Sequence, residues 1–524
     1  MNEKRVLLAA MLSAIFLAWY SQAVMRDVKR LVPQPKEFPA QSLAQQTQTE
    51  TSLDARGKTL IHPIIEEEVT YIESDGIKLE IGQSSGAIRR AELKKFLAAT
   101  GKAPLSFGSN LPLLQVVLRD QELSWKLIEN SQTSAVLETK DKTGKNYRLS
   151  YLINQTNSIV TIELAKSSGE NGSEFSIIST WERADQLENK QNILEAMLAS
   201  SIDGKLKHKK FTGPWKTERI VPRGTSLLSL SERYFCESIK PIGQTASVNL
   251  LPSGESTIAA ESRLTLLSKT ASVATAEVAA YIGPRDYFYL SRAGFESAFP
   301  IGILGKIGLM MLTFLGWLAS VVGNYGVGII LFSGIITLLM APFTLLGFRS
   351  MKKMQNLKPR IDRLTAQHKG DPQRVNRELL ALYKEHKVSP LSGCLPMLIQ
   401  FPVFIALFQA ISHYVELRGR PFLWIKDLSL PDHMAKLPFS LPMLGEHLNA
   451  LPVIMAAAMY VQTKMSQANV AIDQNNPAAK MMSGPLMSVL FGFMFYQFPS
   501  GLVLYWLTNS LFSLIIYRAA TTTA

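Results

Sequence analysis

The sequence predicts a polytopic α-helical membrane protein of about six spans, one N-terminal anchor plus a five-helix core, with an exported all-β sandwich domain. Three observations support this fold class. Apolar residues are concentrated in residues 6–24 and again after Phe299. The stretch between these two regions reads as water-soluble sequence, in which apolar and polar residues alternate. The chain is 47% hydrophobic, and its 19% charged residues are few for a water-soluble protein of 524 residues.

Residues 1–25 are predicted to form a transmembrane anchor. Lys4 and Arg5 precede an apolar run that ends in Trp19 and Tyr20. Aromatic residues of this kind are enriched where a helix leaves the bilayer, and basic residues stay on the cytoplasmic side. The anchor therefore directs the following chain out of the cytoplasm.

A cleaved signal peptide is the alternative to a retained anchor. Ser21 and Ala23 provide a small-x-small site of the kind that signal peptidases cut. Cleavage would remove the anchor without changing the direction of export. Residues 26–56 follow, and their abundant Pro, Gln, Ser and Thr predict a flexible linker.

Residues 57–290 are predicted to form a β-sandwich in the periplasm. Ile77, Leu79 and Ile81 alternate with charged residues, and similar alternation recurs from 147 to 164. Repeated hairpins of this type are typical of a sandwich of roughly 220 residues. The chain has only two cysteines in total, which excludes a disulfide scaffold.

Five apolar segments follow the predicted sandwich. They are residues 303–322, 327–347, 393–415, 448–462 and 485–517. The last segment contains a Pro499-Ser500-Gly501 break. About 20 helical residues cross the ~30 Å hydrocarbon layer, so this segment is long enough for two short helices, 485–498 and 500–517.

The distribution of charge sets the predicted topology. Residues 349–387 contain eleven Lys and Arg against four acids, a net charge of +7 in a chain of +13. The positive-inside rule places this loop in the cytoplasm. That placement requires residues 300–323 to be an interfacial amphipathic helix rather than a span, although an ordinary sixth span is the alternative. The core is then 324–518, with a short cytoplasmic tail, 519–524.

Residues 349–388 predict a basic helical hairpin within that core. Apolar residues recur every three or four positions on both sides of Gly370-Asp371-Pro372, which breaks the pattern. The hairpin is either a solvated element that only fixes orientation or a landing surface for lipid headgroups or ribosomal RNA. The basic side chains assigned to this surface are Lys352, Lys353, Lys358, Arg360, Arg363, Arg374 and Arg377.

The soluble region offers one pattern typical of an enzyme. Residues 82–86, Gly-Gln-Ser-Ser-Gly, fit the nucleophile motif G-x-S-x-G. The one histidine downstream of it in that domain, His208, lies among lysines, so we interpret the motif as a turn between strands. We predict no enzyme, no catalytic residue, no metal and no cofactor. Since more than half of the excess basic charge lies in one predicted loop, we predict no DNA partner. We also predict no small-molecule substrate.

The predicted spans contain uncharged polar residues at helical spacing. Ser333, Thr337 and Thr344 share one stripe of the second span with Ala341. Such residues either line a weakly polar groove or hydrogen-bond neighbouring helices at packing seams. The groove and client-contact candidates are Ser333, Thr337, Thr344, Gln400, Phe404, Tyr505, Trp506, Thr508 and Asn509.

Three segments of the core resemble the YidC family of membrane protein insertases. They are SPLSGCLPMLIQFPVFIALF (389–408), HYVELRGRPFLWIKDLS (413–429) and FPSGLVLYWLTNS (498–510). The resemblance implies a bacterial inner-membrane protein that inserts, folds and assembles other membrane proteins through a polar intramembrane groove, alone or with the Sec translocon. Implied partners are nascent membrane proteins and lipids, with the Sec translocon and the ribosome as further candidates. A secondary transporter is the alternative function.

One position departs from the family pattern. Members usually carry an arginine in the groove on the second span, and the matching residue here is Thr337. Residues 327–347 contain no Lys or Arg. If a positive charge attracts acidic client segments in the family, this chain is expected to work without one at that place.

Overall fold

The computed structural model describes most of the chain beyond the linker. The described residues are 67–98, 103–108, 112–118, 123–155, 158–166, 174–182, 195–202, 205–212, 219–243, 245–251, 259–267, 275–368, 370–386, 395–441, 444–467 and 485–522. They all belong to one compact unit, Ile61–Ala524. The predicted anchor, 1–25, and linker, 26–56, lie outside them.

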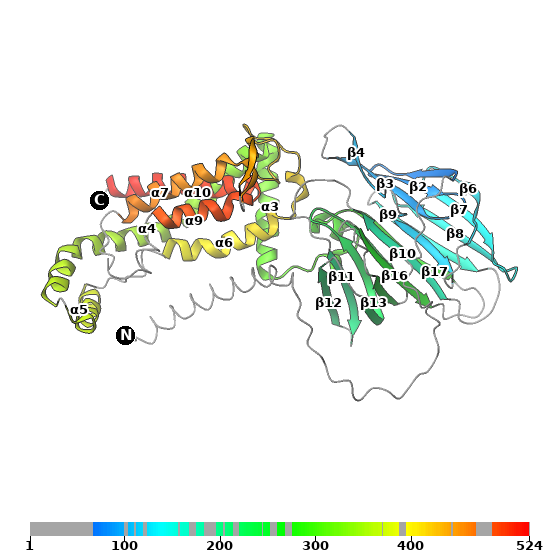
Figure 1. Ribbon diagram of the computed structural model, residues 1–524, viewed down its shortest axis with the longest axis horizontal. Coiled ribbons are helices and arrows are strands. Elements are labelled where there is room, and N and C mark those ends of the chain that lie inside the picture. The colour runs from blue at the N-terminus through cyan, green and yellow to red at the C-terminus, as the bar shows by residue number, and fades with distance from the viewer. Residues whose placement is uncertain are drawn as a thin grey trace, which may run out of the picture. The chain divides into compact units, whose positions relative to one another are not determined.

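Seventeen strands between Val69 and Pro284 form one hydrogen-bonded network, and its pairings are antiparallel (Figure 1). They are β1 (Val69–Glu73), β2 (Ile77–Gly82), β3 (Ile88–Leu97), β4 (Pro104–Phe107), β5 (Leu114–Leu118), β6 (Lys126–Asn130), β7 (Ser134–Lys140), β8 (Asn146–Ile153), β9 (Ile159–Lys166), β10 (Glu174–Glu182), β11 (Glu195–Ile202), β12 (Lys205–Thr212), β13 (Arg219–Ser231), β14 (Phe235–Pro241), β15 (Ala246–Leu251), β16 (Ala259–Leu267) and β17 (Thr275–Pro284).

The long strand β13 joins two halves of this network. Its first part pairs with β15, and its last part pairs with β14 and β11. β15 leads through β16, β10 and β5 to β3, whereas β14 leads through β17 and β9 to β8. The large β-rich domain predicted from the alternating pattern is therefore present.

Aromatic side chains from both halves fill the interior of the β domain. The Trp181 ring stacks on Phe107 with centroids 4.6 Å apart, and Phe107 lies 5.6 Å from Phe235 of the other half. The alternating residues Ile77 and Ile81 are completely buried, which confirms the predicted strand with one buried face. Burial of this apolar surface is the main stabilising contribution to such a domain.

Helices form most of the described chain after Pro284. They are α2 (Tyr287–Arg292), η1 (Glu296–Ala298), α3 (Ile303–Val322), α4 (Tyr325–Gln367), α5 (Pro372–Glu385), α6 (Leu395–Ile411), η3 (Val415–Leu417), α7 (Ala450–Gln467), α9 (Pro485–Met494), η4 (Phe495–Gln497) and α10 (Ser500–Thr522). A short hairpin of β18 (Ala435–Leu441) and β19 (Gly445–Leu448) precedes α7.

The 43-residue helix α4 crosses a predicted domain boundary. The second span and the basic hairpin were predicted as residues 327–347 and 349–388, and the prediction did not specify how the span connects to the first arm of the hairpin. The span and that first arm form a single helix, with Pro342 and Pro359 inside it. Residues 346–353 contain no proline, and the helix continues through Gly347 and Ser350, two residue types that often mark helix ends. The hairpin is therefore a direct extension of a core helix (Figure 1).

The predicted break in the hairpin is confirmed. α4 ends at Gln367 and α5 begins at Pro372, where the Asp371 side chain accepts the backbone N–H of Arg374 at 3.0 Å. Asp before Pro at the first helical position is a strong helix start. Leu357 and Ile361 of α4 pack against Leu379, Leu382 and Tyr383 of α5.

Helix α3 lies across the ends of two core helices (Figure 1). An added Cβ at Gly308 would lie 2.4 Å from the carbonyl oxygen of Ala406, near the end of α6. An added Cβ at Gly328, at the start of α4, would meet Ala319, which lies eleven residues further along α3. Each core helix thus meets α3 at one end only, and the glycines permit the close approach.

Several helices expose large apolar side chains. Met310 and Val321 on α3, Leu338 on α4 and Val453 on α7 are each more than half exposed. By length and apolar composition, Ile303–Val322, Tyr325–Pro342 and Ser500–Ala519 could cross a membrane, and 400–411 and 486–497 are shorter apolar helices. Exposed apolar surface of this extent is typical of lipid contact.

Candidate functional site: a polar cluster in the helical core

Ser333 and Thr337 are buried on one side of α4 and face α10. The Ser333 hydroxyl donates to the backbone oxygen of Tyr505 at 3.2 Å. The Thr337 hydroxyl donates to the Ser333 carbonyl at 2.7 Å and accepts from the Asn509 side-chain amide at 3.1 Å. Residues four apart lie on the same helix face, so both hydroxyls reach the same neighbour.

Tyr505 extends this contact to a third helix. Its ring is completely buried, and its hydroxyl accepts a hydrogen bond from the Gln400 amide of α6 at 2.5 Å. We call Ser333, Thr337, Gln400, Tyr505 and Asn509 the polar cluster. It joins α4, α6 and α10 through uncharged groups, at a depth where these helices are otherwise apolar.

Two other candidates have local hydrogen bonds instead. Thr344 donates to the Met340 carbonyl one turn back, at 3.0 Å, and lies seven residues from Thr337, about 10 Å along the helix. Thr508 is buried, and its hydroxyl donates to the carbonyls of Leu504 and Tyr505 within α10. Sequence spacing placed both residues near the stripe. Thr508 shares the Tyr505 carbonyl with Ser333 but makes no bond to another helix in these pairs, and Thr344 bonds only to Met340.

Phe404 and Trp506 belong to an aromatic group beside the polar cluster. Their rings meet edge to face with centroids 4.9 Å apart. Both also contact Phe495, at 5.6 Å and 5.5 Å respectively. Rings in this arrangement stabilise the packing of α6 against α10 and η4.

Part of the polar cluster is closed off from solvent in this structure, whereas Gln400 and Asn509 are half-buried. Ser333 and Thr337 are 0% and 4% exposed, and hydrogen bonds within the protein satisfy their hydroxyls. Both interpretations of the stripe are therefore compatible with this structure. In the described state, these groups take part in hydrogen bonds between helices. They are also the polar groups that a groove would present if the helices separated.

The basic hairpin presents most of its assigned cations outward. Lys353, Arg360, Arg363, Arg374 and Arg377 are exposed, and Lys358 is half-buried. Of these, Arg374 pairs with Glu378 at 3.1 Å, and Arg360 lies 3.1 Å from the His386 ring. The side chain of Lys352 lies outside what the structure describes.

The structure shows a further segment beside the polar cluster's helices that contains none of the predicted candidate residues. Residues 412–432, which we call the cap segment, run from the end of α6 over the starts of α10 and α7. The Asp432 carboxylate accepts the backbone N–H of Leu451 in the first turn of α7 at 2.9 Å and the Trp424 indole N–H at 3.2 Å. Asp near a helix start is a recognisable signal, but a separation of 19 positions hid the pairing of Asp432 with Leu451 from sequence reasoning.

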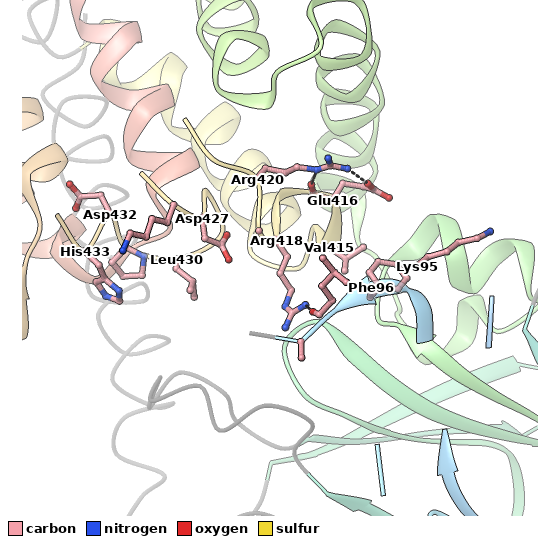
Figure 2. Close-up of a pocket in the computed structure, with 15 residues that line it drawn as sticks. Lys95, Phe96, Val415, Glu416, Arg418, Arg420, Asp427, Leu430, Asp432 and His433 are labelled. Carbon is pink, nitrogen blue, oxygen red and sulfur yellow. Dashed lines mark hydrogen bonds and ion pairs between the residues drawn. The ribbon is translucent and has the colours of Figure 1, made fainter. Parts of the chain in front are cut away.

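A cavity of about 680 Å³ separates part of the cap segment from the end of β3 (Figure 2). It is lined by side chains of both signs, among them Lys95, Arg418, Lys426, Glu416 and Asp427. Figure 2 shows Glu416 paired with Arg420 along its edge. The polar cluster does not line this cavity.

The G-x-S-x-G stretch is a turn between β2 and β3. The Ser84 and Ser85 hydroxyls both donate to the carboxylate of Glu67. Burial raises the pKa of Glu67, but the hydrogen bonds from Ser84 and Ser85 outweigh it and leave that pKa below its usual value. Ser84 is thus tied to a carboxylate. Among the described residues, no group of three or more His, Cys, Asp or Glu is arranged to hold a metal ion.

The helical part of the chain is similar to known proteins. Residues 317–522 match the family model described as 60Kd inner membrane protein. The membrane protein insertase YidC of Pelobacter propionicus is 35% identical over 320 residues, covering 60% of this chain and 57% of that protein. The YidC of Syntrophobacter fumaroxidans is 40% identical over 237 residues, covering 45% and 41%. The chain spans about half the length of the curated relatives it matches.

One solved structure similar to this chain is a crystal structure of an active YidC insertase with the first transmembrane domain resolved. The TM-score is 0.37 at 19% identity, covering 87% of this chain and 93% of that one. The family-model match, residues 317–522, covers the helices that hold the polar cluster. Residues 317–522 are thus similar to the family described as 60Kd inner membrane protein, and the relatives at 35% and 40% identity are YidC membrane protein insertases.

Proposed function

We propose that this chain is a membrane protein insertase that promotes the insertion, folding and assembly of integral membrane proteins. The observation that carries the proposal is the polar cluster, an uncharged hydrogen-bonded group shared by three apolar helices within the region homologous to the insertases. It requires no catalytic residue and no cofactor. Its action would be to bind and release polar groups of a client.

The proposed mechanism lowers a desolvation barrier. A polar segment that crosses hydrocarbon loses its hydrogen bonds to water, at a cost of several kcal/mol for each unsatisfied group. Hydroxyl and amide groups of the polar cluster would exchange their mutual bonds for bonds to that segment. Apolar parts of the client would then move into lipid, which the hydrophobic effect favours.

The proposed topology follows from the charges and from α3. The basic hairpin lies in the cytoplasm, the β domain lies in the periplasm, and the C-terminus is cytoplasmic. In support, α3 crosses the ends of α4 and α6, an orientation suited to a helix lying in the membrane interface. Clients are nascent membrane proteins, with lipids, the ribosome and the Sec translocon as further proposed partners.

Insertion into liposomes that contain only this protein tests the proposal. A single-span client with a short polar tail is expected to reach a protease-protected state faster than in empty liposomes. Correctly folded protein that gives no gain over empty liposomes would contradict autonomous insertion and would favour a transporter or a Sec-dependent chaperone. Liposomes holding an unrelated multi-span protein control for disturbance of the bilayer.

The basic hairpin provides a second test, on the ribosome as partner. Arg363 and Arg377 are exposed cations, and changing both to glutamate reverses two charges. We expect the affinity of the nanodisc-held protein for ribosomes to fall at least tenfold, and its salt dependence to flatten, because phosphate contacts release counterions. The control Lys207→Glu/Lys209→Glu changes charge equally on β12. If both variants bind ribosomes equally well, the hairpin is not a ribosome-binding surface, and its remaining role is to fix the orientation of the protein in the membrane.

A further inference from the structure

The cap segment is held by the β domain as well as by the helices. Val415 packs in the hydrophobic core of the β domain. The Arg233 guanidinium donates to the Ser412 carbonyl at 3.0 Å, and the Tyr289 hydroxyl donates to the Glu416 carboxylate at 2.8 Å. In the other direction, the Arg418 side chain donates to the carbonyl of Leu97 at the end of β3. These contacts come from separate places on the domain surface.

Three consecutive carbonyl groups of the cap segment connect the β domain to α10. The first, of Leu428, accepts the backbone N–H of Gly501 at 2.8 Å, and the third, of Leu430, accepts that of Ser500 at 2.8 Å. The middle one, of Ser429, accepts the hydroxyl of Tyr234 at 3.1 Å. The two outer bonds therefore fix α10, and the central bond fixes the same stretch to the β domain.

The two α10 amides involved are ones that the helix itself cannot satisfy. The first N–H groups of a helix have no partner one turn earlier, and they need a cap. Here the cap segment supplies that partner for Ser500 and Gly501, and the Ser500 hydroxyl also donates to the Leu430 carbonyl. Loss of the cap would leave the start of α10 free to fray or shift.

The start of α10 lies close to the polar cluster along the helix. Tyr505 is five residues beyond Ser500, about 7.5 Å, and Asn509 is nine residues beyond it, about 13.5 Å. Any rotation or shift of the first turn of α10 moves both side chains relative to Gln400 and Thr337. Their hydrogen bonds of 2.5 Å and 3.1 Å leave little room for such movement.

We infer that Tyr234 of the β domain is a positioning residue for the polar cluster, acting through the carbonyl groups of residues 428–430 on the start of α10. Tyr234 and Ser429 are 5% and 1% exposed, so water cannot readily replace the lost donor. Burial raises the pKa of Tyr234, and the phenol therefore remains protonated and able to donate. This assigns a role to the β domain without any ligand of its own.

Amide hydrogen exchange of the full-length protein in nanodiscs tests the inference directly. In Tyr234→Phe, peptides that contain Ser500 and Gly501, and those that cover 424–432, are expected to exchange at least tenfold faster. Peptides from β8 and β9 should keep the wild-type rate. The control Tyr147→Phe removes a phenol that donates to Asp141 within the β domain, and it should leave α10 unchanged. Unchanged exchange at the start of α10 in a folded Tyr234→Phe protein overturns the inference.

A double-mutant cycle with Ser500 gives a second test of the relay. Ser500→Ala removes the hydroxyl bond to Leu430 on the other side of the same stretch. If the relay exists, the effects of Tyr234→Phe and Ser500→Ala on exchange at Gly501 are non-additive, whereas independent sites add. Additive effects would contradict the relay. The consequence of the relay for client insertion rests on the proposed function. The hydrogen-exchange measurements do not, so the relay and the proposed function can fail separately.

Discussion

Replacing Thr337 by valine is expected to slow client insertion by about threefold to tenfold. Valine keeps the shape of threonine and removes only the hydroxyl, which accepts from Asn509 and donates to the Ser333 carbonyl. An interhelical hydrogen bond in a membrane contributes roughly 0.6–1.7 kcal/mol, and 1.4 kcal/mol corresponds to a factor of ten. The expected effect follows if that hydroxyl stabilises a client's polar group during crossing. The measurement is the initial insertion rate in liposomes.

Companion variants separate polarity from packing at this position. Thr337→Ser keeps the hydroxyl and is expected to stay near the wild-type rate, and Thr337→Leu should be at least as slow as valine. Thr337→Arg supplies a stronger donor and is expected to retain or raise insertion, most of all for a client with an acidic tail. Serine as slow as valine would show that the hydroxyl is not the active group.

A matched change outside the polar cluster completes the comparison. Thr313 is an exposed threonine on α3 whose hydroxyl donates to Leu309 within its own helix. Thr313→Val therefore makes the same chemical change without touching α4 or α10, and the insertion rate is expected to be unchanged. A similar loss from both variants would assign the effect to general helix stability instead of the polar cluster.

The β domain and the helix breaks could be predicted because local patterns determine them. Alternation at Ile77, Leu79 and Ile81 indicates a strand with one buried face, and Asp371-Pro372 marks a helix start whatever surrounds it. The continuity of α4 could not be predicted in the same way. The change from apolar to basic sequence near Arg349 looks like an element boundary, yet a change of solvent does not end a helix.

The polar cluster was predictable in part. Period and residue type placed Ser333, Thr337, Gln400, Tyr505 and Asn509 on facing sides, and the structure joins all five. Thr344 and Thr508 fit the same patterns, but each hydroxyl is satisfied by its own helix. The cap segment was missed because its decisive bonds use backbone carbonyls, which carry no sequence signal, and because they join residues about 70 and 195 positions apart.

Glu237 is a buried carboxyl group that the strand pattern concealed. It lies in β14, is 1% exposed, and accepts a hydrogen bond from the Ser179 hydroxyl of β10 at 2.7 Å. Its other carboxyl oxygen has no hydrogen-bond partner among the described residues. Burial raises the pKa of Glu237 to about 8, although the Ser179 bond lowers it somewhat. The group is therefore largely protonated in the folded protein at neutral pH.

This raised pKa predicts that the β domain loses stability as pH increases. Below the ordinary value of 4.5 the carboxyl group is protonated in both the folded and the unfolded state. Between 4.5 and about 8 only the unfolded state ionises, so the free energy of unfolding falls by up to ~1.4 kcal/mol per pH unit. Above about 8 both states are ionised and the loss stops.

Glu237→Gln is expected to remove this pH dependence and to stabilise the β domain at alkaline pH. Glutamine resembles the protonated carboxyl group and can still accept from Ser179, so we expect a gain on the order of 3 kcal/mol at pH 8 and almost none at pH 4.5. Urea unfolding of the full-length protein in detergent at both pH values measures it. Glu163 is an exposed glutamate on β9, and Glu163→Gln should show no such difference. A gain for Glu237→Gln that is equal at the two pH values would mean that ionisation of this group does not limit the stability of the domain, because a change of packing alone has no reason to follow pH.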